Sequence, residues 1–343
     1  ELVVHGTLKV ESTTNDATGE TTRAVLGAGA NPQSWYGILV KPNATLYMNG
    51  EIMNARFGVF IESGAEHTSI TDAYIHHTSN HAVYGCPDEL RNNDFASVGI
   101  EDNAYALRIH GCTADRSYAG NSITDSYGGV YLSSNGNNNK ISLDQWTIQN
   151  CTNQAAIYVP SGGTGHLILT GSTIQDNASY GVNFNATTAL TVQTSVFGGN
   201  GNHAIKMGYG QLKLTDSEIT GHTTGVHLGS GAAANALITR CNLMTNSLYD
   251  IQNKSAHNVD ALGNYWGAPG GADAITEIAQ GTNPRNITKI DDRYDITGVG
   301  FVRYDQWLNQ PMDTNQINLV ITILEPTGHV PLESFNYNVG NII

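Results

Sequence analysis

The chain has 343 residues, of which 40% are hydrophobic and 13% charged, and its formal net charge is −14. Its 16 basic residues form no cluster, which argues against a nucleic-acid partner because phosphate backbones need clustered cations. No run of about 18 apolar residues occurs, so no membrane span is predicted. The four Cys residues are too few for a disulfide scaffold and lack the CxxC spacing of a metal site.

The first residues, ELVVHGTLKV, read as a strand and carry neither an initiator Met nor a signal peptide. We therefore expect a processed protein or an excised module.

A short strand headed by a small residue then recurs: GILV at 37, GVFI at 58, AVYG at 82, ALRI at 106, GVYL at 129, AIYV at 156, GVNF at 181, AIKM at 204, GVHL at 225 and a degenerate DIQN at 250. Successive copies start 21 to 27 residues apart.

A second repeated element precedes these strands in the middle of the chain: ISLDQWTIQN, LILTGSTIQDN, LTVQTSVFGGN, LKLTDSEITGH and LITRCNLMTN. Its apolar residues alternate over only a few positions, which predicts short strands and no helix. A coil of two or three such strands cannot bury its apolar face alone, but stacked copies form a continuous core. The repeat therefore predicts an all-β fold, a parallel β-solenoid, and the usual handedness of parallel connections makes it right-handed.

Two columns of polar or small residues are expected inside the turns. Stacked amides at the end of the second element can bond one another and the turn backbone. This column contains Asn177, Asn200, His222 and Asn246, with Cys151 in the same place. A nearby column contains Ser172, Ser195, Ser217 and Cys241, and both cysteines are interpreted as core fillers rather than reactive thiols.

These repeats resemble the right-handed parallel β-helix repeat family, the pectate-lyase-like superfamily of secreted and surface proteins. The resemblance covers residues 1–267 and implies a single-stranded β-helix of about ten coils. The segments LGNYWGAPGG (262–271) and FVRYDQWL (301–308) look like the ending of many secreted bacterial members. We expect a capping segment at 268–310, and an extension or the start of a following module at 311–343, with a strand at INLVITILEP (317–326).

Strand alternation predicts which side chains point outward. The second residue of each repeated strand faces out, which gives the column Leu39, Phe60, Tyr84, Arg108, Tyr131, Tyr158, Asn183, Lys206, His227 and Gln252. Coils stack about 4.8 Å apart, so the five residues from Phe60 to Tyr158 form a stripe about 20 Å long. Aromatic rings with polar edges suit sugars, and the expected ligand-binding residues are Phe60, Tyr84, Arg108, Tyr131 and Tyr158.

An alternative reading makes the same stripe structural. Aromatic ladders stabilise sheets by themselves, and the long segment CPDELRNNDFASVGIEDN (86–103) could fold over the stripe and bury it.

A second outward column contains Glu62, Cys86, His110, Ser133 and Pro160. For β-elimination from a uronic acid, Arg108 is the candidate neutraliser of the carboxylate, His110 the base and Tyr131 the proton donor. For hydrolysis, which needs two carboxylates, the best pair is Glu62 with Asp115. The candidate catalytic residues are therefore Arg108, His110 and Glu62. The alternative interpretation is that this group is only a polar turn.

No metal site is predicted. His67, His76, His77 and His81 lack an HExxH or comparable spacing and are interpreted as mostly solvated turn residues. No cofactor is expected. The acidic turn residues leave Ca²⁺ binding as an open alternative, although no D-x-D-x-D loop occurs. Cys86 and Cys112 fall in adjacent coils, two residues out of register, and loop bending could close a disulfide between them.

Together these features indicate an extracellular or cell-surface module that binds a polysaccharide or cell-wall glycan without catalysis, as part of a larger multidomain surface protein. The alternatives are a polysaccharide lyase or glycoside hydrolase acting on an acidic glycan, and a ligand-free stalk. Fold alone does not decide among them.

Overall fold

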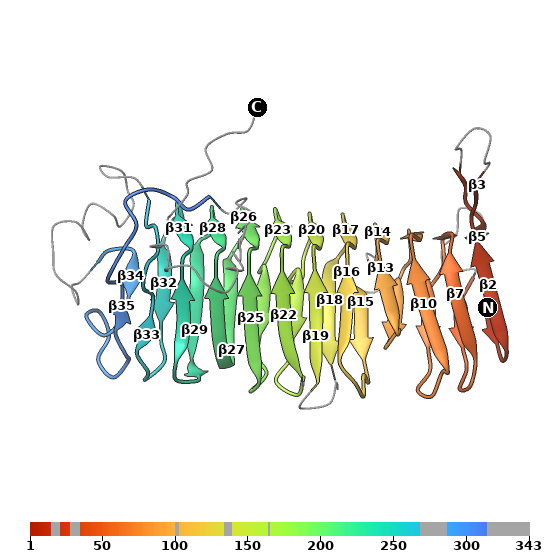
Figure 1. Cartoon of the computed structure of the whole chain (residues 1–343), viewed down its shortest axis with the longest axis horizontal. Coiled ribbons are helices and arrows are strands. Elements are labelled where there is room, and N and C mark those ends of the chain that lie inside the picture. The colour runs from red at the N-terminus through yellow and green to blue at the C-terminus, as the bar shows by residue number, and fades with distance from the viewer. Residues whose placement is uncertain are drawn as a thin grey trace, which may run out of the picture.

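The computed structural model describes residues 1–14, 21–27, 35–99, 103–133, 139–163, 165–267 and 287–313. These residues form strands and turns without a helix, and the strands lie side by side along the long axis of the molecule (Figure 1). Each coil contributes one strand to each of two parallel sheets, here named A and B, and all coils but the last two also contribute a strand to a third, named C. The fold is the predicted all-β, right-handed parallel β-solenoid.

Within a coil, the strand of sheet A is followed by that of sheet B. Sheet A contains β1 (Leu2–Val4), β6 (Ile38–Val40), β9 (Val59–Ile61), β12 (Val83–Gly85), β15 (Tyr105–His110), β18 (Gly128–Ser133), β21 (Ile157–Val159), β24 (Val182–Phe184), the first part of β27 (His203–Thr215), β29 (Thr224–Ala232), β32 (Tyr249–Asn253) and β34 (Ile290–Asp291). Sheet B contains β2 (Thr7–Glu11), β7 (Thr45–Asn49), β10 (His67–Thr71), β13 (Glu89–Arg91), β16 (Arg116–Ala119), β19 (Lys140–Asp144), β22 (His166–Thr170), β25 (Ala189–Gln193), the last part of β27, β30 (Ala236–Thr239), β33 (Val259–Asp260) and β35 (Val302–Arg303).

Sheet C completes all coils but the last two. Its strands are β5 (Val25–Gly27), β8 (Glu51–Met53), β11 (Tyr74–His76), β14 (Asp94–Ala96), β17 (Ser122–Thr124), β20 (Thr147–Gln149), β23 (Thr173–Gln175), β26 (Val196–Gly198), β28 (Glu218–Thr220) and β31 (Asn242–Met244). An antiparallel hairpin of β3 (Thr13–Thr14) and β4 (Thr21–Thr22) stands apart from the coils near the N-terminus.

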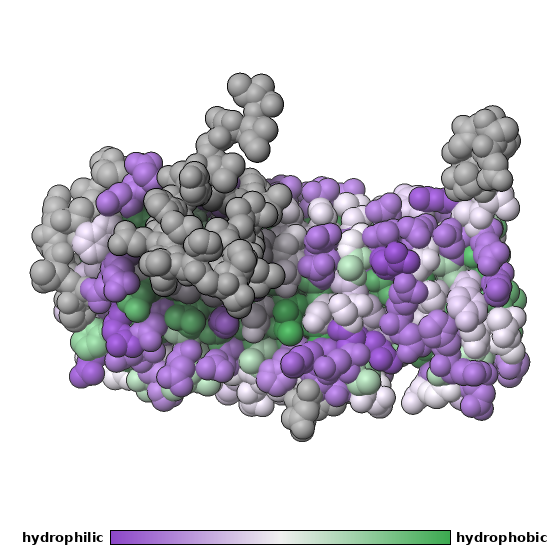
Figure 2. Space-filling model, in the orientation of Figure 1, coloured by the Kyte–Doolittle hydropathy of each residue, from purple (hydrophilic) through white to green (hydrophobic). Residues whose placement is uncertain are grey.

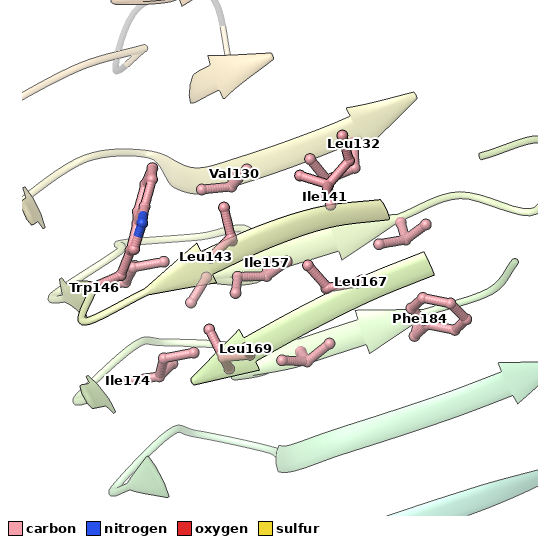
Figure 3. Close-up of a cluster of buried hydrophobic side chains, with 14 of the residues drawn as sticks. Val130, Leu132, Ile141, Leu143, Trp146, Ile157, Leu167, Leu169, Ile174 and Phe184 are labelled. Carbon is pink, nitrogen blue, oxygen red and sulfur yellow. The ribbon is translucent and has the colours of Figure 1, made fainter. Parts of the chain in front are cut away.

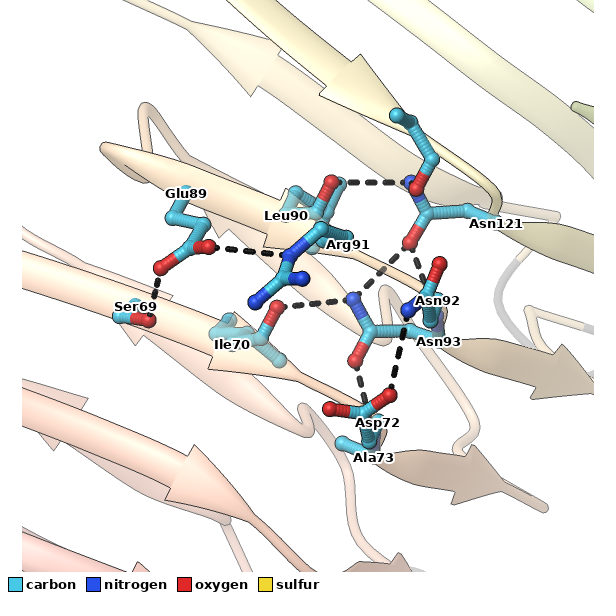
Figure 4. A network of polar contacts seen from close by, with 11 residues as sticks. Ser69, Ile70, Asp72, Ala73, Glu89, Leu90, Arg91, Asn92, Asn93 and Asn121 are labelled. Atoms are coloured by element: carbon cyan, nitrogen blue, oxygen red, sulfur yellow. Dashed lines mark hydrogen bonds and ion pairs between the residues drawn. The ribbon is translucent and has the colours of Figure 1, made fainter. Parts of the chain in front are cut away.

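The corner between sheets B and C turns at a residue with left-handed backbone conformation. Asn, Asp and Gly tolerate this conformation, and they occupy most of these positions: Asp72, Asn92, Gly120, Gln145, Gly171, Thr194, Asp216, Arg240 and Gly263. The next residue points inward. Asn93 Nδ2 donates to Asn121 Oδ1 (2.9 Å) and to the carbonyl oxygen of Ile70 (2.9 Å) (Figure 4).

The two predicted inward columns are confirmed. In the Ser column, the backbone N–H of Ser172 donates to Ser195 Oγ, and that of Ser195 to Ser217 Oγ. At the corner between sheets C and A, Asn177 Nδ2 donates to Asn200 Oδ1 (2.8 Å). Cys151 and Cys241 lie buried in these columns as free thiols, and burial raises the pKa of each to about 12. They are the unreactive core fillers that the sequence predicts.

One continuous apolar core fills the solenoid. Val130, Ile157, Leu143 and Leu169 come from successive coils and two different sheets, and their side chains point toward one another (Figure 3). On the face seen in Figure 2 the described surface is mostly hydrophilic, as the acidic composition leads one to expect.

The chain after residue 286 adds a last, partial coil. Ile290 pairs with Ile251, Val302 with Val259, and Leu308 forms a bridge with Tyr265. Most of the expected capping segment (268–310) thus stacks on the preceding coil, whereas its first part (268–286) lies outside the described residues. The same holds for 314–343, which includes the strand expected at 317–326.

Candidate functional site

The outward column on sheet A is straight. Cα register pairs each member with its equivalent in the next coil, from Leu39 and Phe60 through Arg108 to His227 and Gln252. Every member of the column is half-buried. Phe60, Tyr84, Arg108, Tyr131 and Tyr158 therefore share one exterior line, as the alternation predicts.

The rings within this line do not lie flat on the sheet. Phe60 and Tyr84 stack face to face, with centroids 4.5 Å apart and planes 8° apart. The Arg108 guanidinium lies 5.3 Å from the Tyr84 centroid and 5.0 Å from that of Tyr131. Because the ring faces of Tyr84 contact these neighbours, this part of the stripe presents ring edges to solvent. Tyr131 and Tyr158 meet edge to face.

The described part of the segment 86–103 does not bury the stripe. Residues 89–91 and 94–96 form β13 and β14, which take the ordinary places of sheet B and sheet C strands in their coil. Residues 100–102 lie outside the described residues. The alternative of a stripe covered by this insertion is therefore wrong for its described part, because its residues are needed to close the coil.

A second aromatic row flanks the stripe and was missed by strand alternation. Three residues before each column member stand Tyr36, Phe57, His81, Tyr105, Gly128, Ala155, Tyr180, His203, Thr224 and Tyr249. Tyr105 contacts Tyr131 and Tyr158, with ring centroids 5.3 and 6.1 Å apart. Alternation assigns these positions to the core, but the recurrence of aromatics at this offset was a signal that could have revealed the row.

Gly128 makes room for the ring of Tyr105. A Cβ atom at Gly128 would lie 2.9 Å from Tyr105 Cδ1 and 2.8 Å from the Cβ of Gln154. Tyr105 is therefore held against the stripe, and its burial raises the pKa of its phenol well above the usual value.

Glu62 and His110 line one cleft beside the stripe. The cleft has a volume of about 470 Å³, and Cys86, Asp88, Thr113 and Arg116 also line it. Lys41 Nζ donates to Glu62 Oε1 (2.6 Å), and Arg116 Nη2 to Asp88 Oδ1 (2.9 Å). His110 Nδ1 lies 3.2 Å from Ser133 Oγ.

The candidate catalytic residues are only partly brought together. Arg108 does not line the cleft but lies between Tyr84 and Tyr131. Asp115 does not line it either; its Oδ1 accepts the Lys140 backbone N–H. The carboxylate that does accompany Glu62 in the cleft is Asp88.

Cys86 and Cys112 form a disulfide, with Cα atoms 5.3 Å apart. The bond joins adjacent coils at the edge of the cleft, and it settles the pairing that the sequence left open.

The histidines noted in the sequence are not all solvated. His76 and His81 are 8% and 7% exposed. His76 Nδ1 lies 2.6 Å from His77 Nδ1, His76 Nε2 lies 3.1 Å from Glu51 Oε1, and His81 Nδ1 lies 2.6 Å from the carbonyl oxygen of Tyr105. The interpretation as turn residues in water is wrong for these two, because their polar atoms find protein partners. Across the described part of the chain, no group of three or more His, Cys, Asp or Glu side chains could hold a metal ion.

The middle of the chain matches a known protein family. Residues 82–243 match the model of a right-handed beta helix region. No curated protein matches the sequence. A search for a helix of membrane-spanning length and hydropathy within the described residues found none.

Proposed function

We propose that this right-handed β-helix binds an extended polysaccharide along the outward column of sheet A. The observation that carries the proposal is the register of the column, in which half-buried Phe60, Tyr84, Arg108, Tyr131 and Tyr158 repeat without interruption. Repetition at about 4.8 Å suits a linear polymer, which can make equivalent contacts in successive coils.

The chemistry of the stripe suits a sugar chain. Phenol hydroxyls both donate and accept hydrogen bonds, so the ring edges that the stripe presents can bond to sugar hydroxyls. Arg108 is half-buried and belongs to none of the ion pairs among the described residues, which leaves its charge to attract a polar ligand. The aromatic row of Tyr105 bounds the stripe on one side, and the cleft of Glu62 and His110 lies beside it on the other.

The setting that we propose is extracellular, at the cell surface, within a larger multidomain protein. The Cys86–Cys112 disulfide supports it, since disulfides persist mainly in oxidising compartments.

Binding of soluble glycans, measured by calorimetry or affinity electrophoresis, tests the proposal. Tyr131→Ala and Tyr158→Ala should each weaken binding by about 1–3 kcal/mol, the range for loss of a buried aromatic contact. Tyr47→Ala is the matched control, because Tyr47 is 39% exposed on sheet B. Glycan binding that survives both sheet A substitutions unchanged contradicts the proposal.

A second candidate function is cleavage of an acidic glycan in the cleft. The observation that favours it is the presence of Glu62, Asp88 and His110 around one cavity. Lyase action forms an unsaturated product that absorbs in the ultraviolet, and hydrolysis forms new reducing ends. Either product, lost in His110→Ala or Glu62→Gln, supports cleavage; assays with added Ca²⁺ and with chelator decide whether that ion takes part.

A further inference from the structure

The outward column continues past the aromatic stripe into a polar segment. After Tyr158 its members are Asn183, Lys206, His227 and Gln252. Lys206 lies four coils beyond Arg108, so the two cations are separated by about 19 Å along the same line.

Arg108 and Lys206 are the two cations of the outward column, and they share one environment. Each lies over tyrosine: Arg108 over Tyr84 and Tyr131, and Lys206 Nζ 5.1 Å from the centroid of Tyr180. Neither belongs to any of the ion pairs of the described residues. In a protein with a net charge of −14, two cations of one exterior line thus lack an internal counter-charge.

Polar groups around Lys206 add a second observation. His203 Nδ1 is buried and has no hydrogen-bond partner of good geometry among the described residues. The ring of His203 lies 5.4 Å from that of Tyr180 and 5.1 Å from that of His227. Burial and the nearby His227 and Lys206 lower the pKa of His203 to about 4, so the ring is neutral at pH 7 and can donate one hydrogen bond without adding charge.

The acidic residue that continues the column is already occupied. Asp291 follows Gln252 in the column, and its Oδ2 accepts hydrogen bonds from Gln252 Nε2 (2.7 Å) and Lys254 Nζ (2.5 Å). His227 Nδ1 lies 2.6 Å from Gln252 Oε1. This chain of contacts uses the carboxylate of Asp291 and leaves the ammonium group of Lys206 for a ligand.

We propose a second subsite, which is formed by Tyr180, His203, Lys206 and His227. One anionic substituent of the glycan lies at Arg108, and a second one on the same glycan binds at this subsite. The inference rests on the proposed function and narrows the ligand to a linear chain with carboxylate or sulfate groups. The chain must be long enough to reach both cations. Two anchors on one line select long charged chains over short or neutral ones, because the second contact becomes intramolecular once the first is made.

The experiment measures the affinity of the intact chain for a disaccharide-to-octasaccharide series in two charged forms, a polyuronate and a sulfated glycan, with the unsulfated neutral glycan measured beside them. Lys206→Gln should weaken the longest charged oligosaccharides by about tenfold, the loss expected for one charge-assisted hydrogen bond, and should leave disaccharides unchanged. Lys213→Gln is the matched control, since Lys213 lies exposed on the same strand β27 but on sheet B. Whichever of the two forms shows the Lys206 dependence identifies the anionic group.

The outcomes separate this inference from the proposed function. If Tyr131→Ala weakens binding while Lys206→Gln binds long charged chains like the parent protein, the second subsite is wrong and the stripe stands. If long neutral chains bind as tightly as charged ones, the requirement for anionic groups is wrong. If no glycan binds at all, the proposed function itself fails.

Discussion

Trp146 Nε1 donates a 2.9 Å hydrogen bond to the carbonyl oxygen of Tyr118 in the preceding coil. Both side chains are fully buried, at 1% and 0% exposed. Trp146 stands at the inward corner position that Asn121 fills one coil before and Ser172 one coil after, so a large ring replaces a small polar group. Its backbone N–H donates to Ser172 Oγ (3.0 Å), which continues the column of hydrogen bonds.

Trp146→Phe should destabilise the protein by about 1–3 kcal/mol, because the carbonyl of Tyr118 loses this partner in a buried place. Trp146→Ala should cost about 3–5 kcal/mol through the cavity it leaves. Denaturant unfolding followed by far-UV circular dichroism measures both. Equal stability of Trp146→Phe and the parent protein would show that the hydrogen bond contributes nothing.

The amide column predicts a large cost for a single truncation. Asn177 Oδ1 accepts the backbone N–H of Cys151 (2.9 Å), and Asn177 Nδ2 donates to the carbonyl oxygen of Ile148 (3.2 Å). Asn177→Ala leaves both groups buried and unsatisfied, each at about 1–3 kcal/mol. Gln175→Ala, on the outward side of the adjacent strand β23, is the control and should change the free energy of unfolding by less than about 0.5 kcal/mol. A similar cost for the two variants would contradict the role of the column.

Reduction of the Cys86–Cys112 disulfide should lower stability. The bond closes a loop with a sequence separation of 26, for which the chain-entropy model gives about 3–4 kcal/mol. Thermal unfolding with and without reductant measures the effect. A Cys86→Ser, Cys112→Ser double variant should match the reduced protein and should no longer respond to reductant; a response in that variant would assign the effect elsewhere.

Gly128→Ala should displace the ring of Tyr105, since the new Cβ would lie 2.9 Å from Tyr105 Cδ1. The expected result is a changed near-UV circular dichroism spectrum and weaker glycan binding, with the solenoid still folded. Gly162→Ala is the control, because nothing lies within 4 Å of the Cβ position there. If the two variants give the same spectrum, Gly128 does not hold the space for Tyr105.

The stability of the folded protein should fall on acidification, over the pH range between the unfolded and folded pKa values of His203. Burial lowers the pKa of this imidazole in the folded protein to about 4 from its ordinary value of 6.5. Between these values the unfolded chain binds the proton and the folded chain does not, so stability is full above about pH 6.5 and declines as pH falls toward 4. His203→Gln should flatten the decline, measured as the free energy of unfolding against pH. His5→Gln, at an exposed position, should leave the profile unchanged; an unaltered slope in His203→Gln would contradict the assignment.

The stripe shows how far alternation carries a prediction. Phe60, Tyr84 and Tyr131 could be placed on one line from the sequence, because a strand sends every second side chain to the same face and parallel stacking adds like residues of successive coils. The orientation of their rings could not be predicted from the sequence. The stacking of Tyr84 on Phe60, and of Arg108 on its two neighbours, depends on side-chain torsions that residue order does not specify.

The prediction missed the flanking aromatic row for a related reason. Tyr105 and Phe57 share the parity of core residues, yet their rings contact the outward column. Tyr105, Ala106 and Leu107 are all buried at the start of β15, so the two-residue alternation on which the assignment depended does not hold there.

The sequence by itself determined the solenoid, the inward columns of Asn177 and Ser195 and the exterior line of the stripe, because each follows from a period repeated over many coils. Tertiary structure alone decided the closure of the Cys86–Cys112 disulfide, the cleft shared by Glu62 and His110, and the separation of Arg108 from that cleft. These depend on how corners and side chains bend in single coils, where the repeat supplies no second copy to constrain them.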